Sequence, residues 1–440
     1  MSVGRHGKLA LLGGEPVRQD PYPAHTTRIG EREKRLVNEV LESEALSGFA
    51  AKNDHRWAGG KFVRQLEEAF CARFGVRHAV TFNSATSALH GTVMAAGVEP
   101  GDEVITTPMT MTATASAILM QGGVPVFSDI DDVMFNLDPA RVSGSMTPRT
   151  KAILTVNLCG QASELDELKT RADRIGAVLI EDNSHAYGTR YKGRWTGTIG
   201  QMSVVSLNFH KLIQTGEGGV VLTDDDEYAL RLKLIRNHGE ALVEGLHRED
   251  LPHQLGWNYR MTELQAAVGI GQLEKLDELI DWRVKLAERL SRKLNGHPFL
   301  VPPAVGPERT MTYYVYALKF LAEAAGITRD TFIRAVQAEG VPLNPGYVAP
   351  LYRQPMYRTR QFFGRKGYPF MPGVSDADPE KLYYEGRCPV AECMHDKVMI
   401  TTWSVRYPLT EREMDEMALA VEKVTANLDA LLKWQAGKAE

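Results

Sequence analysis

Short β-branched runs alternate with helical segments along the chain from about residue 78 to residue 226. Because crossover helices join parallel strands, this alternation predicts a large α/β domain built on a mostly parallel, seven-stranded sheet. The expected strands are His78–Phe82, Glu103–Thr107, Pro125–Asp129, Ala152–Leu158, Ala177–Glu181, Ser203–Leu207 and Gly219–Thr223. The expected helices, which carry apolar residues at spacings of three and four, are Ser84–Ala96, Ala113–Gln121, Glu164–Ile175 and Glu227–Asn237.

A second, smaller domain is expected after the sheet, because 440 residues are too many for one simple core. A Leu-, Ala-, Glu- and Lys-rich stretch from Thr262 to about Leu294 predicts one or two helices that lead away from the sheet. We therefore place a boundary near Leu276, with a large domain and an N-terminal arm in residues 1–276 and an α+β domain in residues 277–440. The elements expected in the second domain are a strand-like Tyr313–Lys319, a helix over Arg329–Ala338, a Pro/Gly/Tyr-rich loop over 341–374 and a final helix from Glu411 to about Leu432.

Bulk composition excludes several classes of protein. The formal net charge is −4 without a long Lys/Arg run, so neither nucleic acid nor an anionic membrane is expected as a partner. No stretch reaches the ~18 apolar residues of a membrane span, and the first residues lack the apolar core of an export signal. The four scattered cysteines match no zinc pattern. We expect a cytoplasmic protein with reduced thiols and no metal site.

One lysine has surroundings that favour covalent chemistry. Lys211 follows the expected strand Ser203–Leu207 and precedes the glycine cluster Gly216–Gly219. Its apolar neighbours Phe209, Leu212 and Ile213 would lower the pKa of the amine and favour a Schiff base. A lysine in a loop is more often a solvated surface residue, so this position alone leaves both readings open.

Two further segments carry polar groups at strand ends. Asp182 follows an apolar strand, where a carboxylate lies at the ligand-binding edge of a parallel sheet and can hold a cofactor's ring nitrogen protonated. It can equally cap the next turn, and His185 three residues later can be an ordinary turn histidine. Ser84 and the residues after it open a helix directly after a strand, which makes a natural phosphate cradle.

Taken together and in order, these segments resemble the DegT/DnrJ/EryC1/StrS family of sugar and aminocyclitol aminotransferases, which are fold-type I enzymes that use pyridoxal 5′-phosphate. The resemblance covers the chain from about Gly13 to Val424. Each matching segment is weak alone, but the ordered set is highly specific. These segments are Gly13 to Arg18, Asn83 to Leu89, Pro125 to Asp129, Glu181 to His185, Ser206 to Gly219 and Gly256 to Ala267.

The resemblance implies roles for the residues that match the family's motifs. Lys211 is similar to the lysine that binds the cofactor as a Schiff base, and Asp182 to the carboxylate that pairs with the ring nitrogen. His185 occupies the place of a Gln or His near the ring hydroxyl. These assignments make residues 1–276 the cofactor-binding domain.

The same resemblance implies the phosphate ligands and the assembly. The backbone groups of Ala85 and Thr86 and the hydroxyl of Ser206 are similar to the family's phosphate ligands. Asn258 matches an asparagine that reaches the phosphate from the neighbouring subunit. A homodimer with two shared active sites is therefore implied.

Two positions depart from the family's pattern. Many relatives stack Phe, Tyr or Trp on the cofactor ring, where this chain has Met111, whose thioether can pack on an aromatic face. The second is a substrate-side segment that contains Tyr347 and Tyr352; relatives often carry His where Tyr352 stands. We expect both tyrosines on the substrate side.

The implied reaction moves an amino group from glutamate or glutamine to a keto-sugar, nucleotide-linked or not, or to a keto-cyclitol, in secondary-metabolite or cell-surface sugar biosynthesis. The opening segment Leu9 to Arg18 resembles the start of aminocyclitol and aminohydroxybenzoate-type relatives more than that of nucleotide-sugar enzymes, which implies a keto-cyclitol as a candidate acceptor. Three alternatives stay open: a sugar dehydratase, an aminohydroxybenzoate-synthase-like enzyme and a non-catalytic regulatory relative. Retention of Lys211 argues against the dehydratases, which carry His at this position.

Overall fold

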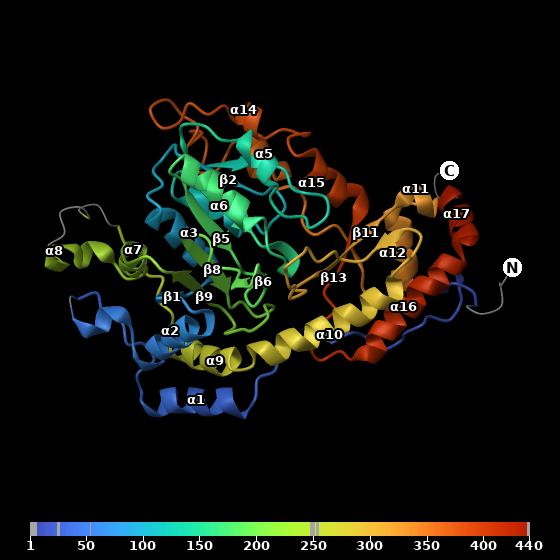
Figure 1. Ribbon diagram of the computed structural model, residues 1–440, viewed down its shortest axis with the longest axis horizontal. Helices are drawn as coiled ribbons and strands as arrows, with labels where there is room; N and C mark the ends of the chain where they lie inside the picture. Colours follow the sequence, from blue (N-terminus) through green and yellow to red (C-terminus); the bar gives the residue numbers. More distant parts are fainter. Residues whose placement is uncertain (1–6, 24–26, 53, 247–250, 252–254, 438–440) are drawn as a thin grey trace.

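The computed structural model describes residues 7–23, 27–52, 54–246, 251 and 255–437. Its centre is a seven-stranded sheet of order β1-β9-β8-β5-β4-β2-β3 (Figure 1). Strand β9 is antiparallel to both β1 and β8, and the other pairs are parallel. The strands are β1 His78–Phe82, β2 Glu103–Thr106, β3 Val124–Phe127, β4 Thr150–Val156, β5 Val178–Asp182, β8 Met202–Ser206 and β9 Gly219–Thr223. The predicted mostly parallel, seven-stranded sheet is confirmed.

Helices cover both faces of this sheet, because side chains alternate between the faces along each buried strand. On β5, Leu179 packs with helix α6 while Ile180 packs on the other face with α3, α4 and α7. On β8, Val204 joins the α3 face and Val205 joins α2 and α9. These helices are α2 Lys61–Phe74, α3 Ala85–Ala95, α4 Ala113–Met120, α6 Leu165–Arg174, α7 Asp226–Arg236 and α9 Glu263–Leu273.

The C-terminal part of the chain forms a second, four-stranded antiparallel sheet of order β10-β11-β13-β12. Helix α10 leads from the first sheet to this one and packs along α16, as Figure 1 shows. The expected stretch from Thr262 to Leu294 is therefore two helices. The bounds are β10 Leu300–Val301, β11 Tyr316–Phe320, β12 Asn344–Pro345, β13 Met399–Thr402, α10 Leu276–Leu294, α12 Arg329–Ala338 and α16 Glu411–Ala426. The division into domains at residue 276 stays a prediction.

Three features differ from what the sequence pattern predicted. Strand β11 begins at Tyr316 rather than Tyr313, because Tyr313 has a left-handed φ of 49° that breaks the extended run. The final helix is interrupted at Asn427, after which α17 runs over Leu428–Ala436. Helix α1, Glu31–Glu42, was not predicted; it packs on α9. Because most residues of α1 are polar or charged, its sequence pattern alone does not indicate a packed helix.

The N-terminal segment lies against the C-terminal elements, although the sequence assigned it to the first domain as an arm. The carboxylate of Glu339, at the end of α12, accepts hydrogen bonds from the backbone N–H groups of Ala10 and Val17. Lys423 of α16 lies 2.7 Å from the same carboxylate and donates to the carbonyl of Glu15. Because Glu339 and Lys423 are buried, this ion pair is well shielded from water.

All four cysteines are free thiols. In the described part of the chain no group of three or more His, Cys, Asp or Glu side chains is arranged to hold a metal ion. None of the described helices combines the length and apolar character needed to span a membrane.

Candidate active site

Asp182 and Ser206 are the last residues of two neighbouring parallel strands, β5 and β8, so they share the C-terminal edge of the sheet. This edge is where open α/β sheets bind ligands. The buried carboxylate of Asp182 accepts a 3.1 Å hydrogen bond from the hydroxyl of Thr114 and a 3.2 Å bond from the backbone N–H of Ser184. Its two oxygens are thus each held by one donor.

Lys211 lies in the loop between β8 and β9 and is only 7% exposed. Its Nζ atom lies 4.6 Å from the centre of the Tyr314 ring, and no described carboxylate forms an ion pair with it. Burial lowers the pKa of Lys211 to about 8, and the negative charge of Asp182 partly opposes this shift. The amine is therefore partly neutral, and so nucleophilic, near neutral pH.

His185 lies beside the lysine and stacks on the same tyrosine. The ring centres of His185 and Tyr314 are 4.1 Å apart with an interplanar angle of 23°, and His185 Nε2 lies 3.4 Å from the Tyr347 hydroxyl. Burial, followed by the charges of Lys211 and His210, lowers the pKa of His185 well below its usual value, so the ring is neutral. In the described residues, His185 Nδ1 and the Tyr314 hydroxyl are buried without a hydrogen-bond partner.

The segment predicted to hold a phosphate is the start of α3. Ser84 caps this helix by accepting a 3.1 Å hydrogen bond from the Ser87 N–H. The backbone N–H groups of Ala85 and Thr86 lie in the first turn, where a helix offers them no carbonyl partner. Ser206 pairs with Gly219 in the sheet. A Cβ atom on Gly219 would lie 2.8 Å from the Ala85 nitrogen, so only glycine lets these segments approach. Ala85, Thr86 and Ser206 are thereby brought together.

Asn258 lies at the edge of this cradle. Its carbonyl accepts a 3.4 Å hydrogen bond from the Asn83 side chain, and its side-chain oxygen accepts a 2.9 Å bond from Arg260. The Asn258 side chain is exposed, as a residue that reaches a neighbouring subunit must be. Its role towards a partner's phosphate stays a prediction.

Met111 occupies the turn between β2 and α4, and its side chain is 55% exposed. Its sulfur lies 3.0 Å from the backbone N–H of Ala113, at the start of α4. The expected packing of Met111 on a cofactor ring stays a prediction.

The structure separates the two tyrosines assigned to the substrate side. Tyr347 joins the cluster through His185, as described above. Tyr352 does not: its ring is 1% exposed and packs on Phe127, and its hydroxyl donates to the carboxylate of Glu392. The hydroxyl also accepts a hydrogen bond from the backbone N–H of Cys388. Tyr352 therefore belongs to the core and is not available to a substrate in this structure, which corrects the sequence-based assignment.

Tyr314 and Thr114 are the two site residues that the sequence did not single out. Tyr314 lay within the expected strand Tyr313–Lys319, and a strand pattern does not tell which ring faces a lysine 103 residues earlier. The buried Arg283 donates to the carbonyls of Tyr313 and Tyr314 and so supports the turn that presents the Tyr314 ring. Thr114 lay within an expected helix, where a threonine carries no signal of its own.

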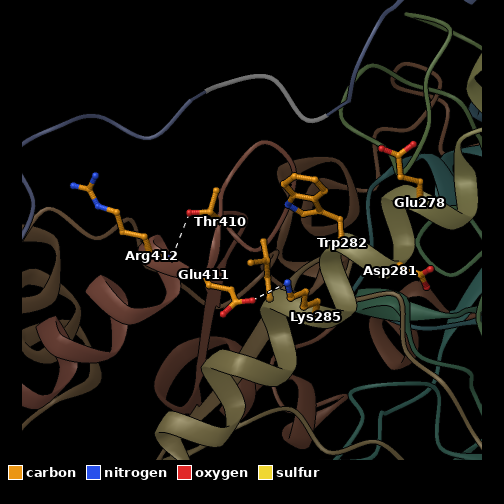
Figure 2. A pocket seen from close by; sticks show the side chains of 8 residues that line it. Glu278, Asp281, Trp282, Lys285, Thr410, Glu411 and Arg412 are labelled. Atoms are coloured by element: carbon orange, nitrogen blue, oxygen red, sulfur yellow. Dashed lines mark hydrogen bonds and ion pairs between the residues drawn. The ribbon is translucent and has the colours of Figure 1, made fainter.

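A cavity of about 740 Å³ lies elsewhere, between α10 and the start of α16 (Figure 2). Trp282 forms part of its wall, and Lys285 pairs with Glu411 at 2.8 Å across it. None of the residues predicted for the active site lines this cavity. Its size alone therefore does not make it the reaction site.

Comparison with known proteins identifies the family. The profile of the DegT/DnrJ/EryC1/StrS aminotransferase family matches residues 31–369. This chain belongs to that family. The predicted family, the fold-type I class and the aminotransferase activity are thereby confirmed.

Three relatives of this family member show the range of similarity. A "putative L-glutamine:3-amino-2,3-dideoxy-scyllo-inosose aminotransferase" of Streptoalloteichus tenebrarius is 35% identical over 431 residues, covering 96% of this chain and 99% of the relative. The GDP-perosamine synthase of Caulobacter vibrioides is 35% identical over 334 residues, covering 75% of this chain and 85% of the relative. Among solved structures, DesI in the presence of its TDP-sugar product has a TM-score of 0.78 at 27% identity, covering 98% of this chain and 99% of DesI.

Proposed function

We propose that this family member transfers an amino group from glutamate or glutamine to the ring ketone of a keto-cyclitol, using pyridoxal 5′-phosphate bound by Lys211. The observation that carries the proposal is the buried Lys211 amine, with its pKa lowered to about 8, in the electrostatic field of Asp182 at the C-terminal edge of the sheet. A buried amine that reacts at neutral pH, beside a fixed carboxylate, is the arrangement that such chemistry needs.

The residues around Lys211 fit pyridoxal phosphate. The buried Nδ1 of His185 and hydroxyl of Tyr314 have no partner among the described residues, and buried polar atoms normally have one. The ring substituents of the cofactor are suitable partners for both. An ionised Asp182 has acceptor sites left for a ring N–H. The open N–H groups at the start of α3 suit a phosphate dianion.

Each group then has a task in the transfer. When bound, the cofactor supplies an aldehyde that takes up the donor's amino group and a ring that withdraws electrons from the donor's α-carbon. Asp182 would keep the ring nitrogen protonated, and the start of α3 together with Ser206 would hold the phosphate. The Lys211 amine would take the proton from the α-carbon of the donor and would deliver a proton to the ketone carbon of the acceptor. Its pKa of about 8 suits both directions near neutral pH.

The lengths of the relatives favour a cyclitol over a nucleotide-linked sugar as the acceptor. The relative named for an inosose aligns over nearly all of both chains, whereas the one named for GDP-perosamine leaves a quarter of this chain unmatched. A nucleotide-linked keto-sugar is the second candidate, and the solved structure with a TDP-sugar product favours it. The exposed side chain of Asn258 is consistent with a homodimer in which each chain completes its partner's site.

A half-reaction screen tests the substrate. Protein loaded with cofactor is first converted to its amino form with glutamine or glutamate, and the excess donor is removed. A panel of keto-cyclitols and nucleotide-linked keto-sugars is then offered, and the absorbance of the bound cofactor is followed. We expect scyllo-inosose-type ketones to restore the original spectrum fastest. Restoration only by nucleotide-linked sugars would overturn the cyclitol assignment, and no conversion by either donor would overturn the transfer itself.

The lowered pKa of Lys211 predicts how covalent uptake of the cofactor depends on pH. The protonated amine cannot attack an aldehyde, so the uptake rate of cofactor-free protein should rise about tenfold per pH unit below 8 and level off above it. A free lysine side chain, with its pKa of about 10.4, should keep gaining rate beyond that point. Uptake followed by absorbance between about pH 6 and about pH 10 checks this, with Nα-acetyl-lysine, whose side-chain amine is free, as the reference amine. A protein that follows the reference amine would contradict it.

A further inference from the structure

Asp182 is reached by a chain of two buried hydroxyl groups from the turn between β2 and α4. The hydroxyls of Thr110 and Thr114 lie 3.0 Å apart, and that of Thr114 lies 3.1 Å from Oδ2 of Asp182. Both threonines are almost completely buried, at 1% and 0% exposure. No water can therefore replace either contact without a change in packing.

The direction of this chain follows from the carboxylate. An ionised carboxylate only accepts hydrogen bonds, so the single proton of the Thr114 hydroxyl must point at Asp182. The oxygen of Thr114 is then free to accept, and Thr110 must be the donor in the contact between the two threonines. Each hydroxyl thus has one assigned role, and the pair presents a fixed dipole to Oδ2.

We propose that Thr110 and Thr114 are positioning residues that orient the Asp182 carboxylate towards the cofactor's ring nitrogen. This inference rests on the proposed function. Thr114 fixes Oδ2 from α4, and the Ser184 N–H fixes Oδ1 from the loop after β5. With one donor on each oxygen, rotation of the carboxylate about its terminal bond is restricted.

The two threonines lie beside Met111, which is the other residue predicted to contact the cofactor ring. Thr110 and Thr114 flank Met111, the residue predicted to pack on the ring. The Thr114 N–H donates a 3.2 Å hydrogen bond to the Met111 carbonyl, so the turn is one rigid unit. The segment from Thr110 to Thr114 would thereby supply the side chain that packs on the cofactor ring and also orient the carboxylate that pairs with the ring nitrogen.

The test removes one hydroxyl at constant shape. In Thr114→Val, we expect kcat of the donor half-reaction to fall about 10–100-fold, as for other residues that orient a functional group, with the KM for the donor little changed. The absorption spectrum of the bound cofactor should shift, because the ring nitrogen is less fully protonated. Thr114→Ser keeps the hydroxyl and should restore both readouts. Thr110→Val should have a smaller effect in the same direction.

Thr92→Val is the matched control, since Thr92 is also a fully buried helical threonine whose hydroxyl donates a hydrogen bond, here to the Leu89 carbonyl. It should leave the spectrum and kcat unchanged. If Thr114→Val does not fold, Thr114→Ala removes the same hydroxyl without a new methyl group. An unshifted spectrum and wild-type kcat in a folded Thr114 variant would overturn the inference alone. Failure of the unaltered protein to take up cofactor would overturn the proposed function and this inference with it.

Discussion

Replacing Lys211 with alanine is expected to abolish turnover and covalent cofactor binding together. The variant lacks both the amine that attacks the aldehyde and the group that moves the proton, so the rate should fall by about 10⁴-fold. The cradle at Ala85, Thr86 and Ser206 is untouched, so the variant should still hold the cofactor non-covalently. Reduction with borohydride followed by mass spectrometry should show a labelled peptide containing residue 211 in the wild type only.

Lys211→Arg separates the charge of the side chain from its reactivity. The guanidinium keeps a positive charge but stays protonated and cannot form the bond, so this variant should be as inactive as the alanine variant. Recovery of activity in Lys211→Arg, or labelling at another lysine in Lys211→Ala, would show that the reactive amine lies elsewhere.

Asp182→Asn should give the second largest loss, about 10²–10³-fold in kcat, because it removes the negative charge aimed at the ring nitrogen while keeping the size of the side chain. The amide oxygen can accept from the Ser184 N–H while the amide NH2 donates to the Thr114 hydroxyl, so the melting temperature should change little. Half-reaction rates with each donor and thermal unfolding measure the two effects. A variant with normal turnover would refute the pairing of Asp182 with the cofactor.

The preceding residue provides a contrast for this variant. Glu181 is fully buried on the opposite face of β5, and its carboxylate accepts hydrogen bonds from the N–H groups of Gly197, Ile199 and Gly200. Glu181→Gln replaces one acceptor oxygen by a donor among these N–H groups, so it should cost about 2–3 kcal/mol of stability. We therefore expect Asp182→Asn to lower mainly the turnover rate and Glu181→Gln to lower mainly the free energy of unfolding.

The sheet could be predicted from sequence because each parallel strand is buried on both faces and appears as an apolar run. β1 and β9 were predicted with the bounds that the structure shows, and the other strands within two residues. Strand order and the second sheet could not be read in this way, since β10 and β12 have only two residues each. Such short strands depend on the partners that the fold brings to them.

The active site was predictable where one segment carried the signal. Asp182 ends strand β5 and Lys211 lies in the loop after β8, and the structure places both in one buried cluster. Tyr314 and Thr114 come from segments whose patterns only indicate a strand and a helix, so their contacts depend on the tertiary packing. The position of Tyr352 along the chain suggested a contact with the substrate. In the structure its hydroxyl instead donates a hydrogen bond to Glu392 in the core.

The anchoring of residues 10–17 by Glu339 and Lys423 has a consequence for the limits of the folded unit. The family profile starts at residue 31 and stops at residue 369, so it omits both the segment held by Glu339 and the helix that carries Lys423. A polypeptide trimmed to the profile would lose the lysine and the backbone donors that bind Glu339, and α12 would lose its packing on α16. The family profile and the folded structure therefore have different limits, because the N-terminal segment and α16 hold each other in place through Glu339 and Lys423.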